Sequence, residues 1–386
     1  MKIALCSKGN FSLEKGFTKN RIELAESLEK LGWETLLVDK QMLGIPSQEK
    51  YNAKSHSAAL KDFLKSHSNE FDVILYEYDT LPFDRSIFSK NTLFVARPAI
   101  LDYHQSYIKF RYDLKTRISH LFKYVKDGLL RRTNDPDSAH KHIQYCLNQS
   151  DLIQVQNKID RKLLITQGFP AEKIIIIPNG ISSERMASFN NYPRNHQEPF
   201  SAAFVGTFDY RKGAMDFSGI FRLLKKRFPS IRLKLLGTRG IFYSVDQVLK
   251  FFPKKFHSNI EVIPKFNADE LPQLLSDCHI GIFPSYLESF GFGALEMMCA
   301  GLPVVAYDVP GPSDFVLSDL LVPSGDFVSL SQKIISLLES RELLEQKSQE
   351  AKDLVLNHYC WDDIAKNVDI SYRYHRQKLQ QVSLSE

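Results

Sequence analysis

A chain of 386 residues exceeds what one hydrophobic core usually supports, so two domains are expected. Hydrophobic content of 43% and charged content of 25% are those of an ordinary soluble globular protein, and no stretch approaches the ~18 apolar residues of a membrane span. The net charge of +5 suits anionic ligands or lipid headgroups, but it is too small to indicate nucleic acid as a partner.

The cysteines and the N-terminus indicate a reducing compartment. The cysteines are odd in number and form no CxxC pair, so we expect buried thiols and not a disulfide framework or a zinc site. Residues 1–10 contain no apolar region of the signal-peptide kind, because Lys8 interrupts the first apolar run. We expect a cytoplasmic protein, with peripheral attachment to the inner face of a membrane left open. The cysteines are Cys6, Cys146, Cys278, Cys299 and Cys360.

The first half of the chain alternates apolar runs with helical patterns. Residues 17–31 show apolar positions close to helical spacing, and Gly32 ends the helix. Strands separated by helices imply parallel βαβ units that are buried on both faces. The expected strands are residues 2–6, 34–39, 71–76, 92–96, 152–155 and 173–178.

Residues 105–133 differ from the rest, because basic and apolar side chains interleave there and only Asp113 and Asp127 offset the positive charge. One interpretation is a basic amphipathic helix that lies on anionic lipid. The alternative is a pair of core-packing helices with a solvated basic face. The basic residues are Lys109, Arg111, Lys115, Arg117, Lys123, Lys126, Arg131 and Arg132.

The second half repeats the α/β pattern after a polar stretch, residues 182–199, that is typical of a linker between domains. The last stretch, from Trp361 to Leu379, has helical character. Two doubly wound domains would place a ligand site in the cleft between them, outside the carboxyl ends of the strands. The expected strands of the second domain are residues 201–205, 231–236, 260–263, 279–283, 303–306 and 320–322.

The second domain opens with a strand, a loop bounded by Gly206 and Gly213, and a helix. Lys212 could reach a diphosphate as a point charge, and Arg211 could do so with two hydrogen bonds. The alternative is an ordinary surface helix N-terminus.

A second strand–loop–helix unit covers residues 283–296. The loop contains Gly291 and Gly293, and the helix, expected over residues 294–300, offers unpaired N–H groups that suit a phosphate. Glu288 in the loop and Glu296 in the helix could both face a ligand there, and we favour hydrogen bonds from sugar hydroxyls to these carboxylates. The alternatives are solvated surface carboxylates or the acid and base of a glycoside hydrolase.

Two further features carry weaker signals. Asp135-Pro136-Asp137 resembles a metal-binding DxD motif, but its setting is typical of a turn and helix cap, so no metal is expected. His104 follows the strand at residues 92–96 in a loop that the topology turns toward the cleft. Its alternative is a solvated loop histidine.

Taken together, these motifs resemble a known family. Pro284-Ser285-x-x-Glu288-x-Phe290-Gly291, followed by Glu296 and Gly301-x-Pro303-Val304-Val305, resembles the Glu-x7-Glu signature of retaining GT-B glycosyltransferases, the "glycosyl transferases group 1" or family-four type. Pro178-Asn179-Gly180 resembles the family's interdomain segment, and residues 321–326 resemble its late "LVPPGD" element. The resemblance extends from about Ser150 to the end of the chain. In the first domain it rests on topology and Gly16.

The resemblance implies a nucleotide-sugar donor bound by the second domain. Glu296 would hold the ribose hydroxyls, and Phe290 and Gly291 would offer backbone N–H groups. Lys212 would neutralise the departing diphosphate, and Glu288 would bind the donor sugar. Gly16 would lie in the first loop near the phosphate.

Two positions depart from the family pattern. Thr207 stands where the family has an arginine, and Arg211 is the candidate substitute. Arg97-Pro98-Ala99 occupies the region where the family often has a histidine, which leaves His104 as the candidate catalytic histidine.

The resulting prediction is a GT-B fold, with domains over residues 1–181 and 200–360 and a helix over residues 361–386 that packs back on the first domain. The expected reaction is metal-independent, retaining transfer of a hexose-type residue to a sugar or lipid-linked acceptor in polysaccharide, glycolipid or other glycoconjugate synthesis. No cofactor other than the donor is expected. The alternatives are a sugar-nucleotide epimerase or hydrolase, and a non-catalytic partner subunit. The sequence does not name the base, the sugar or the acceptor.

Overall fold

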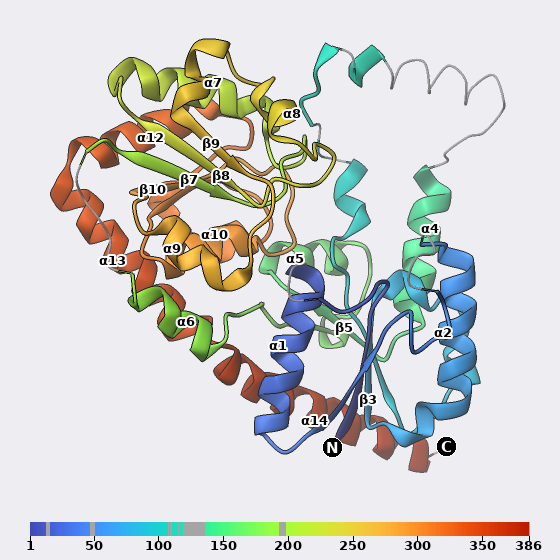
Figure 1. The fold of residues 1–386 in the computed structure, drawn as a ribbon. Coiled ribbons are helices and arrows are strands. Elements are labelled where there is room, and N and C mark those ends of the chain that lie inside the picture. The colour runs from blue at the N-terminus through green and yellow to red at the C-terminus, as the bar shows by residue number, and fades with distance from the viewer. Residues whose placement is uncertain are drawn as a thin grey trace. The chain divides into compact units, whose positions relative to one another are not determined.

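The computed structural model of the chain contains two compact units, each assembled from separate stretches of sequence (Figure 1). It describes residues 1–12, 16–46, 51–106, 108, 110–114, 116–118, 136–192 and 198–385. Unit 1 comprises Met1–Tyr103, Asp135–Ser182 and Tyr359–Glu386. Unit 2 comprises His104–Asn134 and Ser183–His358.

Unit 1 is built on a parallel sheet with strand order β2-β1-β3-β4-β5-β6. The interior strand β1 pairs on both sides, so that Ala4 lies opposite Leu36 on one neighbour and Ile74 on the other. The strands are β1 Lys2–Cys6, β2 Glu34–Val38, β3 Val73–Tyr76, β4 Leu93–Ala96, β5 Leu152–Val155 and β6 Ile174–Ile176. The helices are α1 Gly16–Lys30, α2 Ala53–His67, α4 Pro136–Asn148, α5 Lys158–Thr166 and α14 Trp361–Ser385, with short 3-10 turns at Ser68–Glu70, Tyr78–Thr80, Arg85–Ile87 and Ala171–Lys173.

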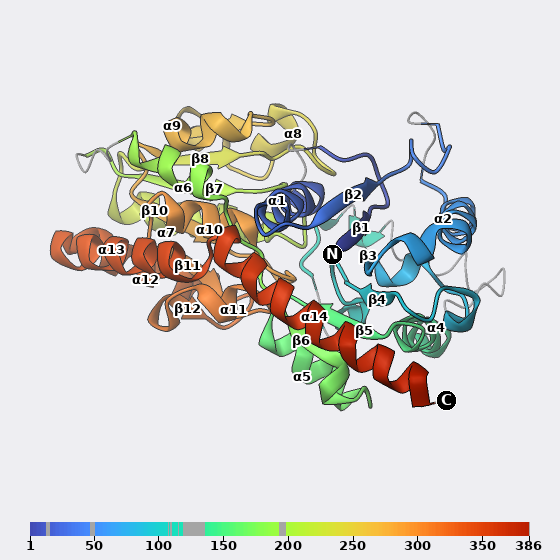
Figure 2. The same ribbon diagram turned by 90° about the horizontal axis from the view of Figure 1, so that it is seen from below.

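Both faces of this sheet are buried, as parallel strands require. Ile3 and Leu5 lie in one core cluster and Ala4 in the other, because successive side chains point to opposite faces. The long C-terminal helix α14 packs in unit 1 against α1 and β4 (Figure 2). Its first residue, Trp361, is buried, and the indole N–H donates to the Glu23 carboxylate at 2.9 Å.

Unit 2 is built on a second parallel sheet, with order β12-β11-β10-β7-β8-β9. The strands are β7 Ser201–Val205, β8 Arg232–Leu236, β9 Ile260–Ile263, β10 Ile280–Phe283, β11 Val304–Tyr307 and β12 Leu321–Val322. The helices are α6 Ser183–Asn190, α7 Ala214–Arg227, α8 Val245–Leu249, α9 Leu271–Leu275, α10 Phe292–Cys299, α11 Pro312–Phe315, α12 Phe327–Glu339 and α13 Arg341–His358. Short 3-10 turns cover Lys254–Asn259, Ala268–Glu270 and Ser318–Leu320, and a further turn, Asp102–Ser106, begins in the residues of unit 1 and ends in those of unit 2.

The strand order of unit 2 sets the position of its loops. The chain runs from β7 outward through β8 to β9 and then returns to β10 on the other side of β7. The chain leaves β7 and β10 toward opposite edges of the sheet, so the loops after these neighbouring strands flank the point where the strand order reverses, which is the usual ligand site of such sheets.

The prediction of two doubly wound α/β sheets is confirmed. One local prediction is wrong: the expected linker contains α6, because Met186 and Phe189 give it a buried face. The predicted helix after the glycine loop begins two residues earlier, at Phe292, because Gly291 caps it in the left-handed region with φ of 97°.

The segment after β4 differs from the predicted domain boundaries. Contacts group His104–Asn134 with unit 2, not with the remainder of residues 1–181. The Arg111 guanidinium bonds to Asp216, and the Asp113 carboxylate accepts from Tyr210. Most of the predicted amphipathic stretch at residues 105–133, including Arg131 and Arg132, lies outside the described residues. In the described part of the chain, no helix has the length and apolar character needed to cross a bilayer.

Candidate active site

The loop between β7 and α7 depends on Gly213. This glycine caps α7 with φ of 81°, and a Cβ built on it would lie 2.2 Å from the Pro284 carbonyl oxygen. A side chain therefore fits neither the backbone conformation nor the space. Gly213 brings the loop that carries Arg211 and Lys212 against the loop that follows β10.

A second glycine makes the same approach from the other loop. A Cβ on Gly293, in the first turn of α10, would lie 1.9 Å from the Val205 carbonyl oxygen. Backbone contacts then join the two loops, because the Tyr286 N–H donates to the Arg211 carbonyl at 2.8 Å and the Arg211 side chain donates to the Leu287 carbonyl at 2.8 Å. The residues of the two loops that were predicted to bind the sugar donor thus lie next to one another.

Lys212 and Glu288 form a hydrogen-bonded ion pair at this junction. Both side chains are largely buried, with 13% and 8% exposed, and Arg211 approaches the second Glu288 oxygen at 3.7 Å. Burial raises the pKa of Glu288, but Lys212 and Arg211 more than offset it and hold that pKa below its ordinary value. Burial lowers the pKa of Lys212, against the opposing effect of Glu288. The carboxylate is therefore ionised at neutral pH.

Asp209 shapes the loop from within. Its carboxylate accepts from the Lys212 backbone N–H at 2.9 Å and from the Thr207 hydroxyl at 3.1 Å. Thr207, at the position of the family arginine, thus bonds to the loop itself. Arg211, four residues later, is the side chain that approaches Glu288.

Glu296 lies on α10 and is buried. It accepts a hydrogen bond at 2.5 Å from Arg185 of α6, a residue that sequence reasoning missed because α6 was taken for linker. A carboxylate oxygen beside a guanidinium can also accept hydrogen bonds from hydroxyls.

Phe290 and Gly291 precede α10. The Phe290 ring is buried against Phe315 at a centroid distance of 5.2 Å, so its side chain packs in the core. Gly291 supplies no side-chain cap to α10. The N–H groups of the first turn therefore suit an anion.

A buried carboxylate supports the β10 loop from beneath. Asp216 on α7 is 0% exposed and accepts from the Tyr286 hydroxyl at 2.7 Å, the Tyr307 hydroxyl at 2.8 Å and Arg111 at 2.5 Å. Burial, followed by the bond to Asp216, raises the pKa of Tyr286. Since Tyr286 stands two residues before Glu288, this network fixes the loop that carries the carboxylate.

The remaining predicted residues belong to other elements of the chain. Gly16 begins α1, and Lys15 lies outside the described residues. His104 is buried in the turn Asp102–Ser106. Arg97 is buried in unit 1 and bonds to Asn20 and Asn179, and burial together with Arg21 lowers its pKa to about 10.

No described residues suggest a metal centre. The described part of the chain contains no group of three or more His, Cys, Asp or Glu side chains placed to hold an ion. Asp135 of the DxD motif lies outside it, and Pro136 begins α4. Metal independence stays a prediction.

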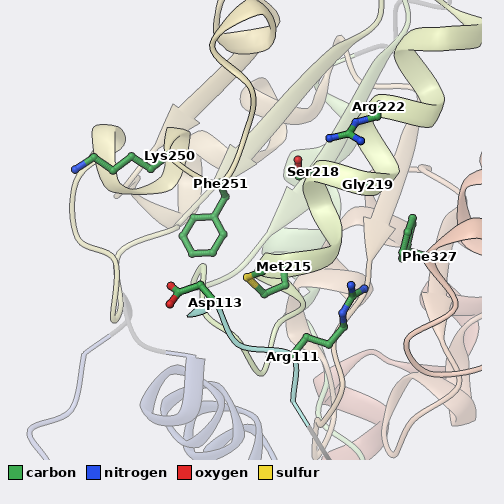
Figure 3. A pocket seen from close by; sticks show the side chains of 9 residues that line it. All are labelled: Arg111, Asp113, Met215, Ser218, Gly219, Arg222, Lys250, Phe251 and Phe327. Carbon is green, nitrogen blue, oxygen red and sulfur yellow. The ribbon is translucent and has the colours of Figure 1, made fainter. Parts of the chain in front are cut away.

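A cavity of about 460 Å³ lies in unit 2 against α7 (Figure 3). None of the predicted site residues lines it. The lining residues are Arg111, Asp113, Met215, Ser218, Gly219, Arg222, Lys250, Phe251 and Phe327.

Comparison with solved structures defines the fold class. The chain is similar to sucrose-phosphate synthase from Thermosynechococcus elongatus, with a TM-score of 0.73 and 17% identity over 97% of this chain and 98% of that one. It is also similar to Anabaena HepE in complex with UDP and glucose, with a TM-score of 0.66 and 15% identity over 96% and 99% of the two chains. These likenesses show a GT-B fold.

A family model matches the second half of the sequence. Residues 187–354 match the family described as "Glycosyl transferases group 1", which confirms the resemblance that the motifs indicate. Among curated relatives, Bacillus subtilis YqgM, an uncharacterized glycosyltransferase, is 28% identical over 47% of this chain and 49% of its own. Staphylococcus aureus CapM, a capsular polysaccharide biosynthesis glycosyltransferase, is 22% identical over 58% of this chain and 61% of its own. The chain thus spans about half to three fifths of the length of these relatives.

Proposed function

We propose that the protein is a glycosyltransferase that moves a sugar from a nucleotide-sugar donor to an acceptor hydroxyl, in polysaccharide, glycolipid or other glycoconjugate synthesis. The observation that carries the proposal is the buried Lys212–Glu288 pair, with Arg211 beside it, at the carboxyl ends of β7 and β10. It lies in the unit that contains the family match.

The charges suit a diphosphate leaving group. Lys212 has three N–H donors, of which the ion pair uses one, and it can turn to a phosphate oxygen while Arg211 compensates Glu288. Preorganised cations stabilise the negative charge that develops as the sugar–phosphate bond breaks. The N-terminus of α10 adds backbone N–H groups on the same side.

The carboxylates suit the hydroxyl groups of the donor. Glu288, held ionised, accepts from hydroxyls of the donor sugar, and Glu296, held by Arg185, accepts from the ribose. We further propose, from the family resemblance, that the transferred group is a hexose, that its configuration is retained and that no metal takes part. Because HepE was solved with UDP, uridine is the first base to test.

The experiment is a thermal-shift screen of the purified protein with UDP-, GDP- and ADP-sugars, followed by transfer assays with the donor that binds. A donor at 100 times its dissociation constant stabilises the native state by about 2.7 kcal/mol. Lys212→Met combined with Glu288→Gln should abolish transfer, whereas Lys226→Met, an exposed lysine of α7, should not. Wild-type turnover by the double variant would overturn the proposal.

The rival functions separate in the same assay. A hydrolase or epimerase would convert the donor when no acceptor is added. In a reaction without acceptor, the hydrolysed or epimerised sugar would therefore be the main product. A non-catalytic subunit would bind the donor and show no turnover with any acceptor. Thr207, which stands where the family has an arginine, is the sequence feature behind this alternative.

A further inference from the structure

Two buried polar side chains at the carboxyl edge of the unit 1 sheet lack hydrogen-bond partners. His56, in the first turn of the helix that follows β2, is 1% exposed, and neither of its ring nitrogens has a partner among the described residues. Gln156, directly after β5, is 3% exposed, and in the same described part of the chain neither atom of its amide has one. Buried polar groups are normally hydrogen-bonded, so two such exceptions at one edge of a sheet point to a ligand.

His56 faces two lysines that follow the neighbouring strands β1 and β2. Burial lowers the pKa of His56, and the charges of Lys40 and Lys8 lower it further. Asp79 opposes these effects without offsetting them. The imidazole is therefore neutral at neutral pH, with one nitrogen that donates and one that accepts. The Tyr51 ring lies 5.5 Å from it and is 43% exposed, so an accessible aromatic ring borders the buried one.

Arg97, directly after β4, extends this edge along the sheet. Its guanidinium donates to two asparagine oxygens, while its Nε has no partner among the described residues. Strands β4 and β5 are paired, so Arg97 and Gln156 both lie where neighbouring strands end. Glu77, directly after β3, connects the two ends of the edge, because its charge acts on both Arg97 and Lys8.

The charge of this edge is positive. Six charged side chains act on one another or on His56, and we name them the basic edge: Lys8, Arg21, Lys40, Glu77, Asp79 and Arg97. Glu77 is paired with Arg21, and Asp79 with Lys8 at 2.6 Å. Asp39 also follows β2, but its carboxylate accepts from two backbone N–H groups of its own turn at 3.0 and 3.2 Å. Four cations therefore stand against two carboxylates, a net charge of +2, or +1 when Asp39 is counted.

We propose that the basic edge and His56 bind a carboxylate or phosphate group of the acceptor sugar. The inference rests on the proposed glycosyltransferase function and names the chemistry of its acceptor. A positive potential around a buried imidazole favours an anion over a neutral hydroxyl. The imidazole can donate to that anion, Lys8 and Lys40 add charge-assisted hydrogen bonds, and the exposed Tyr51 ring suits the C–H face of a pyranose.

The test is calorimetric titration of the full chain, at constant ionic strength, with glucose, glucuronate and glucose 6-phosphate, and with the corresponding galactose series. We expect at least one anionic sugar to bind about tenfold or more tightly than its neutral parent, as for a hydrogen bond to a charged group. Whether glucuronate or the sugar phosphate binds distinguishes the two anions. Absence of any such preference would overturn the proposal. So would equally tight binding of inorganic phosphate, because the sugar would then contribute nothing.

Two variants assign this binding to the basic edge. Lys8→Met with Lys40→Met should remove the preference for the anionic sugar. His56→Phe keeps an aromatic ring but removes the two nitrogens without partners, so it should weaken binding of the anionic sugar by about tenfold while the melting temperature stays equal or rises. A merely structural histidine predicts the reverse, a lower melting temperature with unchanged affinity, and that result would contradict the proposal.

The matched control is Lys65→Met with Lys162→Met, two exposed lysines of α2 and α5, which should bind as wild type does. Equal affinity of this control and the Lys8/Lys40 variant would refute the assignment. Titration of UDP, GDP and ADP into the same variants separates the inference from the proposed function. Loss of nucleotide affinity in the Lys8/Lys40 variant would assign the edge to the donor diphosphate and overturn the inference. Binding of an anionic sugar by a protein that binds no nucleotide sugar would instead refute the proposed function alone.

Discussion

At the scale of single residues, the candidate site is a buried pair of opposite charges. Removing one partner of such a pair leaves an uncompensated charge in a poorly solvated place, whereas removing both does not. Lys212 and Glu288 are buried enough for this asymmetry to dominate, and Arg211 at 3.7 Å compensates Glu288 only in part.

Lys212→Met should therefore lower the free energy of unfolding by about 3–5 kcal/mol, because it isolates the Glu288 carboxylate. Lys212→Met combined with Glu288→Gln should recover most of that loss. Urea denaturation of the wild type, both single variants and the double variant gives the coupling directly. Additive losses would show that the two side chains do not act as a pair.

The same pair predicts a pH dependence. The pKa of Glu288 in the folded chain lies below its ordinary value of 4.5, so its charge stabilises the fold above about pH 4.5. This contribution is lost as the pH falls through the folded-state pKa. Denaturation between pH 7 and 3 should show a steeper loss for wild type than for Glu288→Gln. Parallel curves would contradict the lowered pKa.

At the scale of elements, two loops meet because glycines permit it. Gly213 and Gly32 have the same φ of 81°, but a Cβ meets the Pro284 carbonyl at 2.2 Å in the first case and nothing within 4 Å in the second. Comparing substitutions at these two glycines therefore separates the cost of backbone strain from the cost of a steric clash.

Gly32→Ala should cost only the left-handed backbone strain, about 1 kcal/mol. Gly213→Ala should cost more than that, because the loop must also move away from Pro284. Thermal unfolding of both variants measures the difference. An equal loss of stability in the two variants would show that the close approach of Gly213 to Pro284 does not contribute to the cost.

The Asp216 network makes a prediction about loop order. Tyr286→Phe and Tyr307→Phe each remove one hydroxyl bond to Asp216, but only Tyr286 belongs to the loop that carries Glu288. Backbone amides of residues 285–291 should exchange hydrogen faster in Tyr286→Phe than in Tyr307→Phe. Identical exchange would mean that the loop is held by its backbone contacts alone.

Much of this architecture could be predicted from sequence. Apolar runs such as residues 201–205 and 279–283 can be recognised as buried strands because they are short and bounded by turn residues. The meeting of Lys212 with Glu288 follows from parallel strands in one doubly wound sheet. The role of Asp216 could not be predicted from the sequence, because its hydrogen-bond partners lie 70, 91 and 105 positions away in the chain. Arg185 was missed because residues 182–199 were interpreted as a linker and not as containing α6.

At the scale of the whole molecule, the chain is divided so that its last helix returns to the first unit. Trp361 begins α14 and is 1% exposed, in the same core cluster as Ile3, Leu5 and Val73. The C-terminal helix is therefore part of the core of unit 1. Just before this helix, the Tyr359 carbonyl accepts a hydrogen bond at 2.9 Å from the N–H of Ile181, which lies 178 positions earlier in the sequence.

We propose that Lys212 and Glu288 of unit 2 act together on a nucleotide-sugar donor. The most direct measurement is calorimetric titration of UDP-sugars, GDP-sugars and ADP-sugars into the wild type, Lys212→Met, Glu288→Gln and the exposed control Lys226→Met. The account predicts that at least one donor binds wild type and control alike, and that Lys212→Met loses affinity for both the donor and its free nucleoside diphosphate. It also predicts that Glu288→Gln loses affinity for the donor alone. Unchanged donor affinity in both Lys212→Met and Glu288→Gln would contradict it.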